Sequence, residues 1–466
     1  MKEFAAEENF TVLIPENFYS LVAERHIKTP KLPRRTTKLE IEEKVSDLPE
    51  TESLYYKDQY MAEFDAKVLR VLEGKTVVLD KTAFYPEGGG QPSDKGYLQF
   101  RGQKCRVLNV QKVGKVILHE IEGPPPMEGE TVHGIIDWDR RLSLMRHHTA
   151  THLLLGAARR VLGEHVWQAG AQKGTERSRL DISHYRRLSL REIHQIEKLA
   201  NMAVMMNMPV KAFWMAREEA ERRFGFRLYQ GGVVPGRVIR VVKSGDWDVE
   251  ACGGTHCKST GEVGFIKIVH TERVQDGVER IIFSAGLPAI KAVQEEELKI
   301  HEISNVLNVP FDRVDKAVGN LVSEWRALRQ ERDRLLDTLS SFVADRLSEE
   351  AIKIGEIKVI IQNMKETPID QLIKVANTLV SREPKAIVAL FHEGRNARFV
   401  VTVGDEVIKR GLTADEIARE AAAPLGGGGS GRPNFAQGGG VNTDKIPEAI
   451  KRTVAFLKAK LEKVRR

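Results

Sequence analysis

The sequence is poor in cysteine and has no long apolar run. Three cysteines, at positions 105, 252 and 257, stand among 466 residues, too few for a disulfide framework. No window approaches the ~18 consecutive apolar residues of a membrane-spanning helix, and the acidic N-terminal stretch MKEFAAEENF lacks the apolar core of a secretory signal. These absences argue against a disulfide-stabilised secreted domain and a membrane protein, and they predict a cytoplasmic protein.

The composition is that of a folded protein with several domains. Apolar residues make up 41% of the chain and charged residues 29%, which excludes a mainly disordered protein. The length predicts two to four domains at roughly 100–200 residues each. The formal net charge of +7 is a mild excess, so it permits a nucleic-acid partner without requiring one.

The pattern along the chain predicts a multidomain α+β protein. Stretches such as FDAKVLRVLEGKTVVLD and KCRVLNVQKVGKVILHEI alternate apolar and polar residues, as half-buried hairpins do, with the Gly-rich PEGGGQPSDKG between them. Amphipathic segments predict helices at 139–163, 189–208 and 214–224, and strands at 237–243, 262–270 and 279–286. The expected segments are a linker or tail (1–56), a small antiparallel β-barrel (57–138), an α+β core (139–286), a helical hairpin (287–350) and a C-terminal α/β domain (351–466).

A heptad pattern runs along the second helix of the expected hairpin. Apolar residues follow one another in steps of four and three, interrupted at Arg332; they are Val314, Val318, Leu321, Trp325, Leu328, Leu335, Leu339 and Phe342. One interpretation is a helix that packs on its own domain. The other is a helical hairpin that also pairs two chains, which predicts a homodimer through 287–350.

Four residues in two motifs have the chemistry and spacing of a metal site. His148 and His152 stand at i and i+4, one helical turn apart on one face. Cys252 and His256 flank two glycines that let the backbone fold tightly. Either motif alone is ambiguous, because chance histidine pairs and buried cysteines are common. Together they supply four ligands that favour zinc, with a purely structural zinc as the alternative.

The two motifs, HHTATHLL and ACGGTHC, resemble the zinc signature of the alanyl-tRNA synthetase editing domain and of the freestanding AlaX editing proteins. Three further stretches agree in order: KTAFYPEGGGQPSDKG (81–96) resembles the loop of the barrel before the editing core, RLDISHY (179–185) a strand of its pocket, and LGGGGSGRPNFAQGGG (425–440) the C-terminal DHH-associated domain. The segment 12–26 resembles a linker of archaeal-type alanyl-tRNA synthetases. The resemblance covers nearly the whole chain.

The resemblance implies hydrolysis of Ser-tRNA(Ala) and Gly-tRNA(Ala). A pocket built for alanine rejects glycine and serine poorly, so a second, hydrolytic site corrects the error. It implies a Zn²⁺ held by His148, His152, Cys252 and His256. Whether the metal activates water or positions the substrate stays open. Cys257 and His147 are expected to be bystanders.

The resemblance also suggests roles for residues outside the metal motifs. Thr82 is a candidate for recognising the serine hydroxyl, with a strand-forming threonine as the plain alternative. Gln91, Arg179 and Asp181 are further candidates for the catalytic pocket, although a loop residue and a salt-bridged strand explain them as well. The candidate tRNA-binding residues are Gly88, Gly89, Gly90, Arg432 and Asn434.

A class II aminoacylation core is expected to be missing. No room exists for it before residue 57, and no later stretch resembles it, so the chain alone is not expected to attach alanine to tRNA. Three interpretations stay open. The chain is a lone editing hydrolase, it is a subunit or fragment that acts with a separate class II catalytic chain, or it is a tRNA-binding scaffold with a structural zinc.

Overall fold

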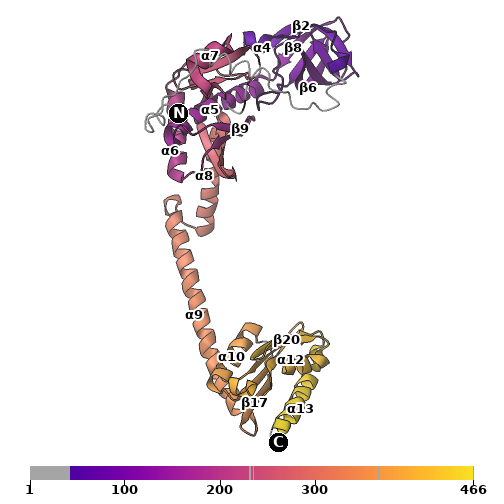
Figure 1. Ribbon diagram of the computed structural model, residues 1–466, viewed down its shortest axis with the longest axis vertical. Coiled ribbons are helices and arrows are strands. Elements are labelled where there is room, and N and C mark those ends of the chain that lie inside the picture. The colour runs from indigo at the N-terminus through magenta and orange to yellow at the C-terminus, as the bar shows by residue number, and fades with distance from the viewer. Residues whose placement is uncertain (1–41, 230–231, 233, 235, 366, 465–466) are drawn as a thin grey trace, which may run out of the picture. The chain divides into compact units, whose positions relative to one another are not determined.

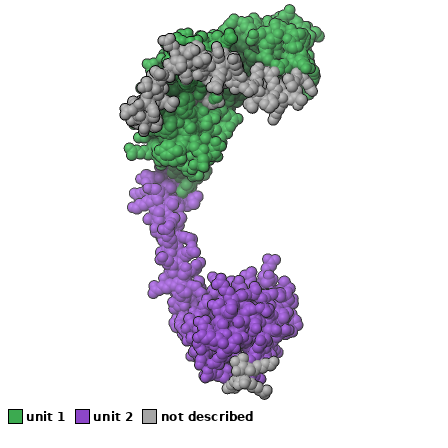
Figure 2. Space-filling model, viewed as in Figure 1, with its two compact units in different colours: residues 1–303 green, residues 304–466 purple. Residues whose placement is uncertain are grey.

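The structure, a computed structural model, describes residues 42–464 apart from 230, 231, 233, 235 and 366. The expected linker at 12–26 lies outside the described residues. The chain divides into two compact units, residues 1–303 and 304–466, coloured separately in Figure 2. The division falls within α8 (Leu287–Leu307), inside the predicted helical segment 287–350. No helix of the described part is long and apolar enough to cross a membrane.

The first unit begins with a closed barrel of six strands, as the alternating pattern predicts. Each neighbouring pair is antiparallel, and every second side chain points into an apolar interior that includes Phe64, Val77 and Leu98. In barrel order the strands are β2 (Glu63–Leu72), β3 (Thr76–Leu79), β7 (Val116–Glu122), β6 (Gln103–Val113), β5 (Gly96–Phe100) and β8 (Thr131–Ile136). Before the barrel come β1 (Glu52–Ser53), which pairs with β4 (Lys81–Thr82), and α4 (Leu54–Lys57).

The rest of the first unit is the α+β core. The long helix α5 (Trp138–Leu162) is capped by the Asp137 side chain and ends at Gly163, whose φ of 113° suits a residue without a Cβ. It packs with α6 (Leu190–Met205) against a sheet with the order β14 (Ile266–Gln275), β15 (Val278–Ala285), β10 (Ser178–Ser183) and β9 (Gln168–Gln172). A second sheet has the order β11 (Val210–Ala216), β12 (Val238–Ser244) and β13 (Asp248–Ala251).

One predicted helix of this core begins later than expected. The predicted helix 214–224 is a strand up to Ala216, and α7 spans only Arg217–Phe224. The bulky stretch Phe213, Trp214 and Met215 belongs to β11, because such residues favour strands. Short 3₁₀ helices complete the chain: η1 (Gly225–Leu228), η2 (Thr260–Val263), η3 (Phe311–Arg313), η4 (Ala423–Leu425) and η5 (Thr443–Lys445).

A buried ion pair joins the barrel to the core. Arg141, on the first turns of α5, has no exposed surface and donates to the carboxylate of Asp94 in the loop before β5. Its remaining donors reach the backbone carbonyls of Gln59 and Ala83 at 2.9 and 2.6 Å. Asp94 also accepts from the backbone N–H of Tyr85. The position of the barrel loop against the core is therefore fixed by a fully hydrogen-bonded charge pair.

The second unit is built on one six-stranded sheet. All neighbouring strands are antiparallel except the parallel pair β17–β18. The strand order is β16 (Ile352–Ile354), β17 (Ile357–Asn363), β18 (Ala386–Glu393), β19 (Ala397–Val403), β21 (Phe435–Gly440) and β20 (Gly428–Arg432). The helices are α9 (Val314–Glu349), α10 (Ile369–Arg382), α11 (Asp405–Ile408), α12 (Ala414–Ala422) and α13 (Ile446–Val464), several of them labelled in Figure 1.

The glycine-rich segment 425–440 contains a β-hairpin, formed by β20 and β21, at the edge of this sheet. Glycine is depleted in strands, which hides the hairpin from a propensity argument. Close packing requires it here: a Cβ at Gly438 would lie 2.4 Å from Cζ of Phe399, and one at Gly429 2.5 Å from the carbonyl oxygen of Ala418.

The heptad stripe on α9 stays largely exposed, including at its C-terminal end: Trp325, Leu328 and Phe342 are 58%, 71% and 70% exposed. The C-terminal turns of α9 pack beside α10 through two other residues, Ala344 and Leu347. Packing on its own domain therefore does not explain the stripe.

Candidate metal centre

Two histidines from one buried helix supply half of the centre. The middle of α5 is buried on every side, so His148 and His152 lie in the core with 2% of each exposed. Their ring centroids are 5.6 Å apart, as expected for residues one turn apart. Helix geometry therefore aims both imidazoles at the same side of α5.

The loop that follows β13 brings the other two side chains. The Sγ atom of Cys252 lies 3.2 Å from Nε2 of His148 and 3.4 Å from Nε2 of His256. A Cβ on Gly254 would lie 2.1 Å from Cε1 of His148, so only glycine allows this approach. One ligand atom from each of His148, His152, Cys252 and His256 lies within 4.8 Å of all the others. The structure thus brings together all four predicted ligands.

Each histidine of the cluster also faces an oxygen that does not belong to the cluster. Nδ1 of His148 is 2.7 Å from Oε1 of Gln91, and Nδ1 of His256 is 3.2 Å from Oγ1 of Thr149. Nδ1 of His152 is 3.3 Å from a carboxylate oxygen of Asp248. Outer partners of this kind hold the rings of metal-binding histidines in place and set which nitrogen carries the proton.

For three of the four residues, burial and mutual contact shift the pKa values in the direction that metal binding needs. Burial lowers the pKa of His148 well below its ordinary value and that of His256 to about 4. Burial alone raises the pKa of the Cys252 thiol, but the adjacent His148 and His256 outweigh it and hold the pKa well below its usual range. Neutral imidazoles beside a thiolate are the forms that bind a metal ion.

Two buried carboxylates extend the cluster behind His152. Asp248 and Glu250 form with His152 a second group whose ligand atoms lie within 4.8 Å of one another. Burial raises the pKa of Glu250, while for His152 the opposing effect of burial is outweighed by Glu250 and the pKa rises well above its ordinary value. Both directions follow from one proton shared between the two groups.

The residues fit a zinc ion. One thiolate and three imidazoles in one cluster, the histidines buried and Cys252 half-buried, are the ligand types that zinc prefers. Oε1 of Glu250 is buried without a hydrogen-bond partner among the described residues, a costly arrangement that a bound cation would relieve. Zn²⁺ therefore stands as the candidate cofactor on the chemistry of this donor set.

The Gly-rich loop of the barrel reaches the cluster through Gln91. This side chain is fully buried, and both of its ends are occupied: Oε1 accepts from His148 and from the N–H of Thr255, and Nε2 donates to Oγ1 of Thr255. Gln91 thus ties the loop to both metal motifs. Its contacts are those of a residue that positions His148, and its place in a catalytic pocket stays a prediction.

The three glycines before Gln91 pack the loop against β9. Gly89 and Gly90 have positive φ values of 58° and 75°, and a Cβ on Gly90 would lie 2.2 Å from the carbonyl oxygen of Ala171. The buried Lys173 donates from Nζ to the Gly89 carbonyl at 3.0 Å and from its backbone to the Gly90 carbonyl at 2.7 Å. Gly88 forms an isolated bridge with Gln91. A role of these glycines in tRNA binding stays a prediction.

The other predicted pocket residues have partners elsewhere. Thr82 is buried in the barrel, where its hydroxyl lies 2.8 Å from Nε2 of His119 and accepts from the N–H of Phe84. Asp181 forms a cross-strand ion pair with Arg280 at 2.7 Å. Nε of Arg179, on the same strand, is buried without a partner among the described residues.

The C-terminal candidates lie in the second unit, at the tip of the β20–β21 hairpin. Arg432 is the last residue of β20 and is exposed, and Asn434 belongs to the turn that follows it. The backbone carbonyl of Asn434 accepts from the N–H of Val403. Their predicted contact with tRNA is not tested by these positions.

The neighbouring His147 and Cys257 are not part of the cluster. His147 contacts the Ser143 carbonyl at 2.9 Å and the N–H of Ala285 at 3.2 Å. Cys257 is buried, and burial raises the pKa of its thiol to about 12.

Sequence reasoning missed Thr149, Lys173, Asp248 and Glu250. A signal existed for the two carboxylates, because Asp248, Glu250 and Cys252 alternate along a strand and so share a face.

Three family profiles match the chain. The profile described as the threonyl and alanyl tRNA synthetase second additional domain matches residues 239–282, and the DHHA1 domain matches 356–459. A third, described as tRNA synthetases class II (A), matches 1–140. This match corrects the expectation that the class II core is missing altogether, because a fragment at residues 1–140 matches it. In the described part of that stretch, residues 42–140, the structure has the barrel and the start of α5.

The chain is also similar to full-length alanine–tRNA ligases. The chain is 49% identical to those of Thermococcus kodakarensis and Pyrococcus furiosus and 45% identical to that of Methanothermobacter thermautotrophicus, over 98% of the chain in each case. It spans about half the length of these relatives, 49% of each. The crystal structure of the C-Ala domain from Aquifex aeolicus alanyl-tRNA synthetase is 33% identical over 24% of this chain and 96% of that one, with a TM-score of 0.22.

Proposed function

Because the chain is homologous to alanine–tRNA ligases over nearly its whole length, we propose that it is a zinc-dependent editing hydrolase that cleaves the ester of Ser-tRNA(Ala) and Gly-tRNA(Ala). The observation that carries the proposal is the buried cluster of His148, His152, Cys252 and His256. A hydrolytic site complements a synthetic one, because the synthetic pocket discriminates poorly against a smaller or isosteric amino acid.

The chain's own residues hold and orient this centre. Zinc, when bound, supplies a Lewis acid that polarises an ester carbonyl or lowers the pKa of water. Gln91 and Thr149 fix the rings of His148 and His256, while Gly254 lets the backbone of the second motif approach the first. The buried ammonium of Lys173 holds the Gly-rich loop on the core beside them. Together these contacts leave the ligand atoms preorganised in a buried site.

The proposed role of Thr82 has a direct test. If its hydroxyl recognises serine, Thr82→Val should weaken hydrolysis of Ser-tRNA(Ala) more than that of Gly-tRNA(Ala). Equal loss on both substrates would instead assign Thr82 to the barrel interior, where His119 and the N–H of Phe84 already satisfy its hydroxyl.

A second candidate is a subunit that edits in complex with a separate class II catalytic chain. It shares the proposed chemistry with the lone hydrolase and differs from it in the partner. In either case we propose tRNA(Ala) as the partner, a homodimer through the exposed stripe of α9, and no aminoacylation by this chain alone. A tRNA-binding scaffold with a structural zinc is the non-enzymatic alternative.

The deciding experiment is deacylation by the purified chain. Ser-tRNA(Ala), Gly-tRNA(Ala) and correctly charged Ala-tRNA(Ala) are compared, before and after chelation and readdition of zinc. Selective, zinc-dependent loss of serine and glycine is expected. If the zinc-loaded chain alone hydrolyses none of them, but hydrolysis begins when a class II chain is added, the result would favour the subunit. If no hydrolysis occurs with or without the class II chain, the remaining hypothesis is the tRNA-binding scaffold with a structural zinc.

A further inference from the structure

We propose that Tyr56 and Trp214 form an aromatic shelf beside the metal centre on which the unpaired terminal adenine of a tRNA stacks. The proposal rests on the proposed function, because it places the base that carries the aminoacyl ester. It assigns a ligand contact to two residues that neither the sequence motifs nor the family profiles single out.

The shelf belongs to the sheet that carries a metal ligand. Trp214, on the edge strand β11, pairs directly with Arg240 on β12. The backbone carbonyl of Arg240 in turn accepts from the N–H of Cys252 at 3.1 Å. The three residues therefore form one row across the sheet, and at a spacing of about 4.8 Å between strands Trp214 lies about 10 Å from Cys252.

Tyr56 connects the two ends of this row. Its ring lies edge-on to Trp214, with centroids 5.4 Å apart and an angle of 86° between the rings. The guanidinium of Arg240 is 5.2 Å from the same ring, and the Tyr56 hydroxyl is 3.4 Å from the position of a Cβ on Gly253, next to Cys252. Arg240 is itself fixed, because it donates to the carbonyls of Cys252 and Gly254 at 2.8 and 2.9 Å. Tyr56 is thus held in place from the metal side.

The other end of the row is open. Trp214 is 54% exposed, although a large aromatic side chain normally gains from burial. Unpaired bases stack on exposed aromatic rings of this kind, and stacking needs no specific hydrogen bonds. In an aminoacylated tRNA one ribose carries both the terminal base and the ester. A base that stacks about 10 Å from the centre would therefore leave the ester within reach of it.

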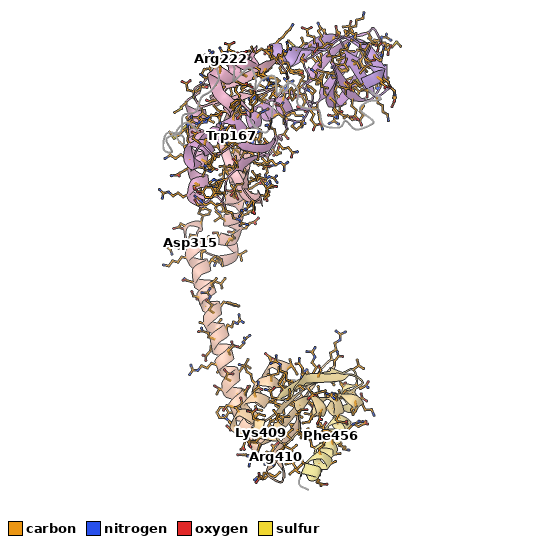
Figure 3. All side chains as sticks on the ribbon, in the orientation of Figure 1. Trp167, Arg222, Asp315, Lys409, Arg410 and Phe456 are labelled. Carbon is orange, nitrogen blue, oxygen red and sulfur yellow. The ribbon has the colours of Figure 1, made fainter. Side chains whose placement is uncertain are left out.

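The test uses uncharged tRNA(Ala) with 2-aminopurine in place of the terminal adenine, so it requires no hydrolysis. The fluorescence of this base should change on binding to the wild-type chain, and Trp214→Ala should abolish the change and weaken binding on the order of tenfold. Trp214→Phe should restore part of both. The matched control is Trp167→Ala, which removes a tryptophan of similar exposure from the same unit (labelled in Figure 3) and should behave as the wild type.

The outcomes separate the shelf from the proposed hydrolysis. A signal lost in Trp214→Ala and kept in Trp167→Ala supports the shelf, even if no ester is ever cleaved. An unchanged signal in Trp214→Ala overturns it, even if editing is demonstrated. Zinc content is measured for each variant. If Trp214→Ala loses zinc, the test relies on Trp214→Phe with its full zinc content. A fluorescence change restored in that variant supports stacking. If all three variants lose the signal equally, the shelf is also overturned.

Discussion

The described part of the first unit buries many ionisable side chains, whereas the described part of the second buries only serine and threonine among its polar residues. In the first unit the fully or nearly fully buried groups include Asp94, Arg141, Lys173 and the three histidines of the metal cluster. In the second they are Ser304, Ser340, Thr402 and Thr453. Burying an ionisable group costs free energy unless the group is paired. Holding these groups in place therefore lowers the free energy of unfolding of the first unit. The second is held by apolar packing, and any contact it makes with RNA must come from its surface.

Each unit also has a glycine-rich segment, and the two have different uses. In the first unit Gly254 brings backbone against His148, a candidate ligand. In the second, Gly429 and Gly438 let the β20–β21 hairpin pack closely against Ala418 of α12 and Phe399 of β19. The same composition therefore builds a site in one place and an edge of a sheet in the other, and only the neighbouring residues tell them apart.

The largest expected effect is in the metal cluster of the first unit. Cys252→Ala should remove zinc and lower kcat/KM for deacylation by about 10³-fold, because the variant loses the one charged ligand. Metal analysis and deacylation of Ser-tRNA(Ala) measure the two effects. Cys257→Ala, five residues from Cys252 and outside the cluster, is the control and should keep zinc and most of the activity. Full activity of Cys252→Ala would contradict the zinc assignment.

Acid should destabilise the first unit more than the second. Burial lowers the pKa of His119 from 6.5 to about 4. As the pH falls, the unfolded chain therefore binds this proton before the folded chain does. The free energy of unfolding is at its full value above pH 6.5, falls between pH 6.5 and about 4, and levels off below that. The total loss is roughly 3 kcal/mol for this group alone. Denaturant unfolding of the wild type and of His119→Gln across this range measures the difference. Equal pH slopes for the two proteins would refute the prediction.

The outer partner of His148 should matter less than the ligands do. Gln91→Leu removes the acceptor for His148 and both contacts with Thr255, so zinc affinity should fall about 10–100-fold while the fold is kept. Competition with a chromogenic chelator gives the affinity. Gln437→Leu, at an exposed position of β21 in the second unit, is the matched control. A wild-type zinc affinity in Gln91→Leu would mean that the loop does not support the centre.

The smallest effect is expected in the second unit. Arg432→Ala should weaken tRNA binding about fivefold and lower the slope of affinity against salt by about one charge, leaving zinc untouched. Filter binding at several salt concentrations measures both. A point variant is needed, because deleting 425–466 would also remove the core residues Ala436, Ala449 and Leu457. An unchanged slope would place the RNA contact elsewhere on the unit.

Local patterns in the sequence predicted the parts of the centre that depend on local geometry. The i, i+4 spacing of His148 and His152 and the turn between Cys252 and His256 were visible, as was the alternation that builds the barrel. The contacts of Gln91 could not be foreseen, because its partners lie 57 and 164 residues away. The sequence pattern places the shelf residue Trp214 in the predicted helix 214–224, since helical and strand periods overlap where β11 meets α7.

The ion pair between Arg141 and Asp94 has a practical consequence. Mobile ions screen charges at a surface over distances of about 10 Å or less, but they do not enter a pair with no exposed surface. Contacts between exposed arginines and RNA phosphates lack that protection. A wash at about 1 M salt should therefore remove bound RNA from the chain while the barrel stays packed against α5. Such a wash would separate the nucleic acid from an otherwise intact protein.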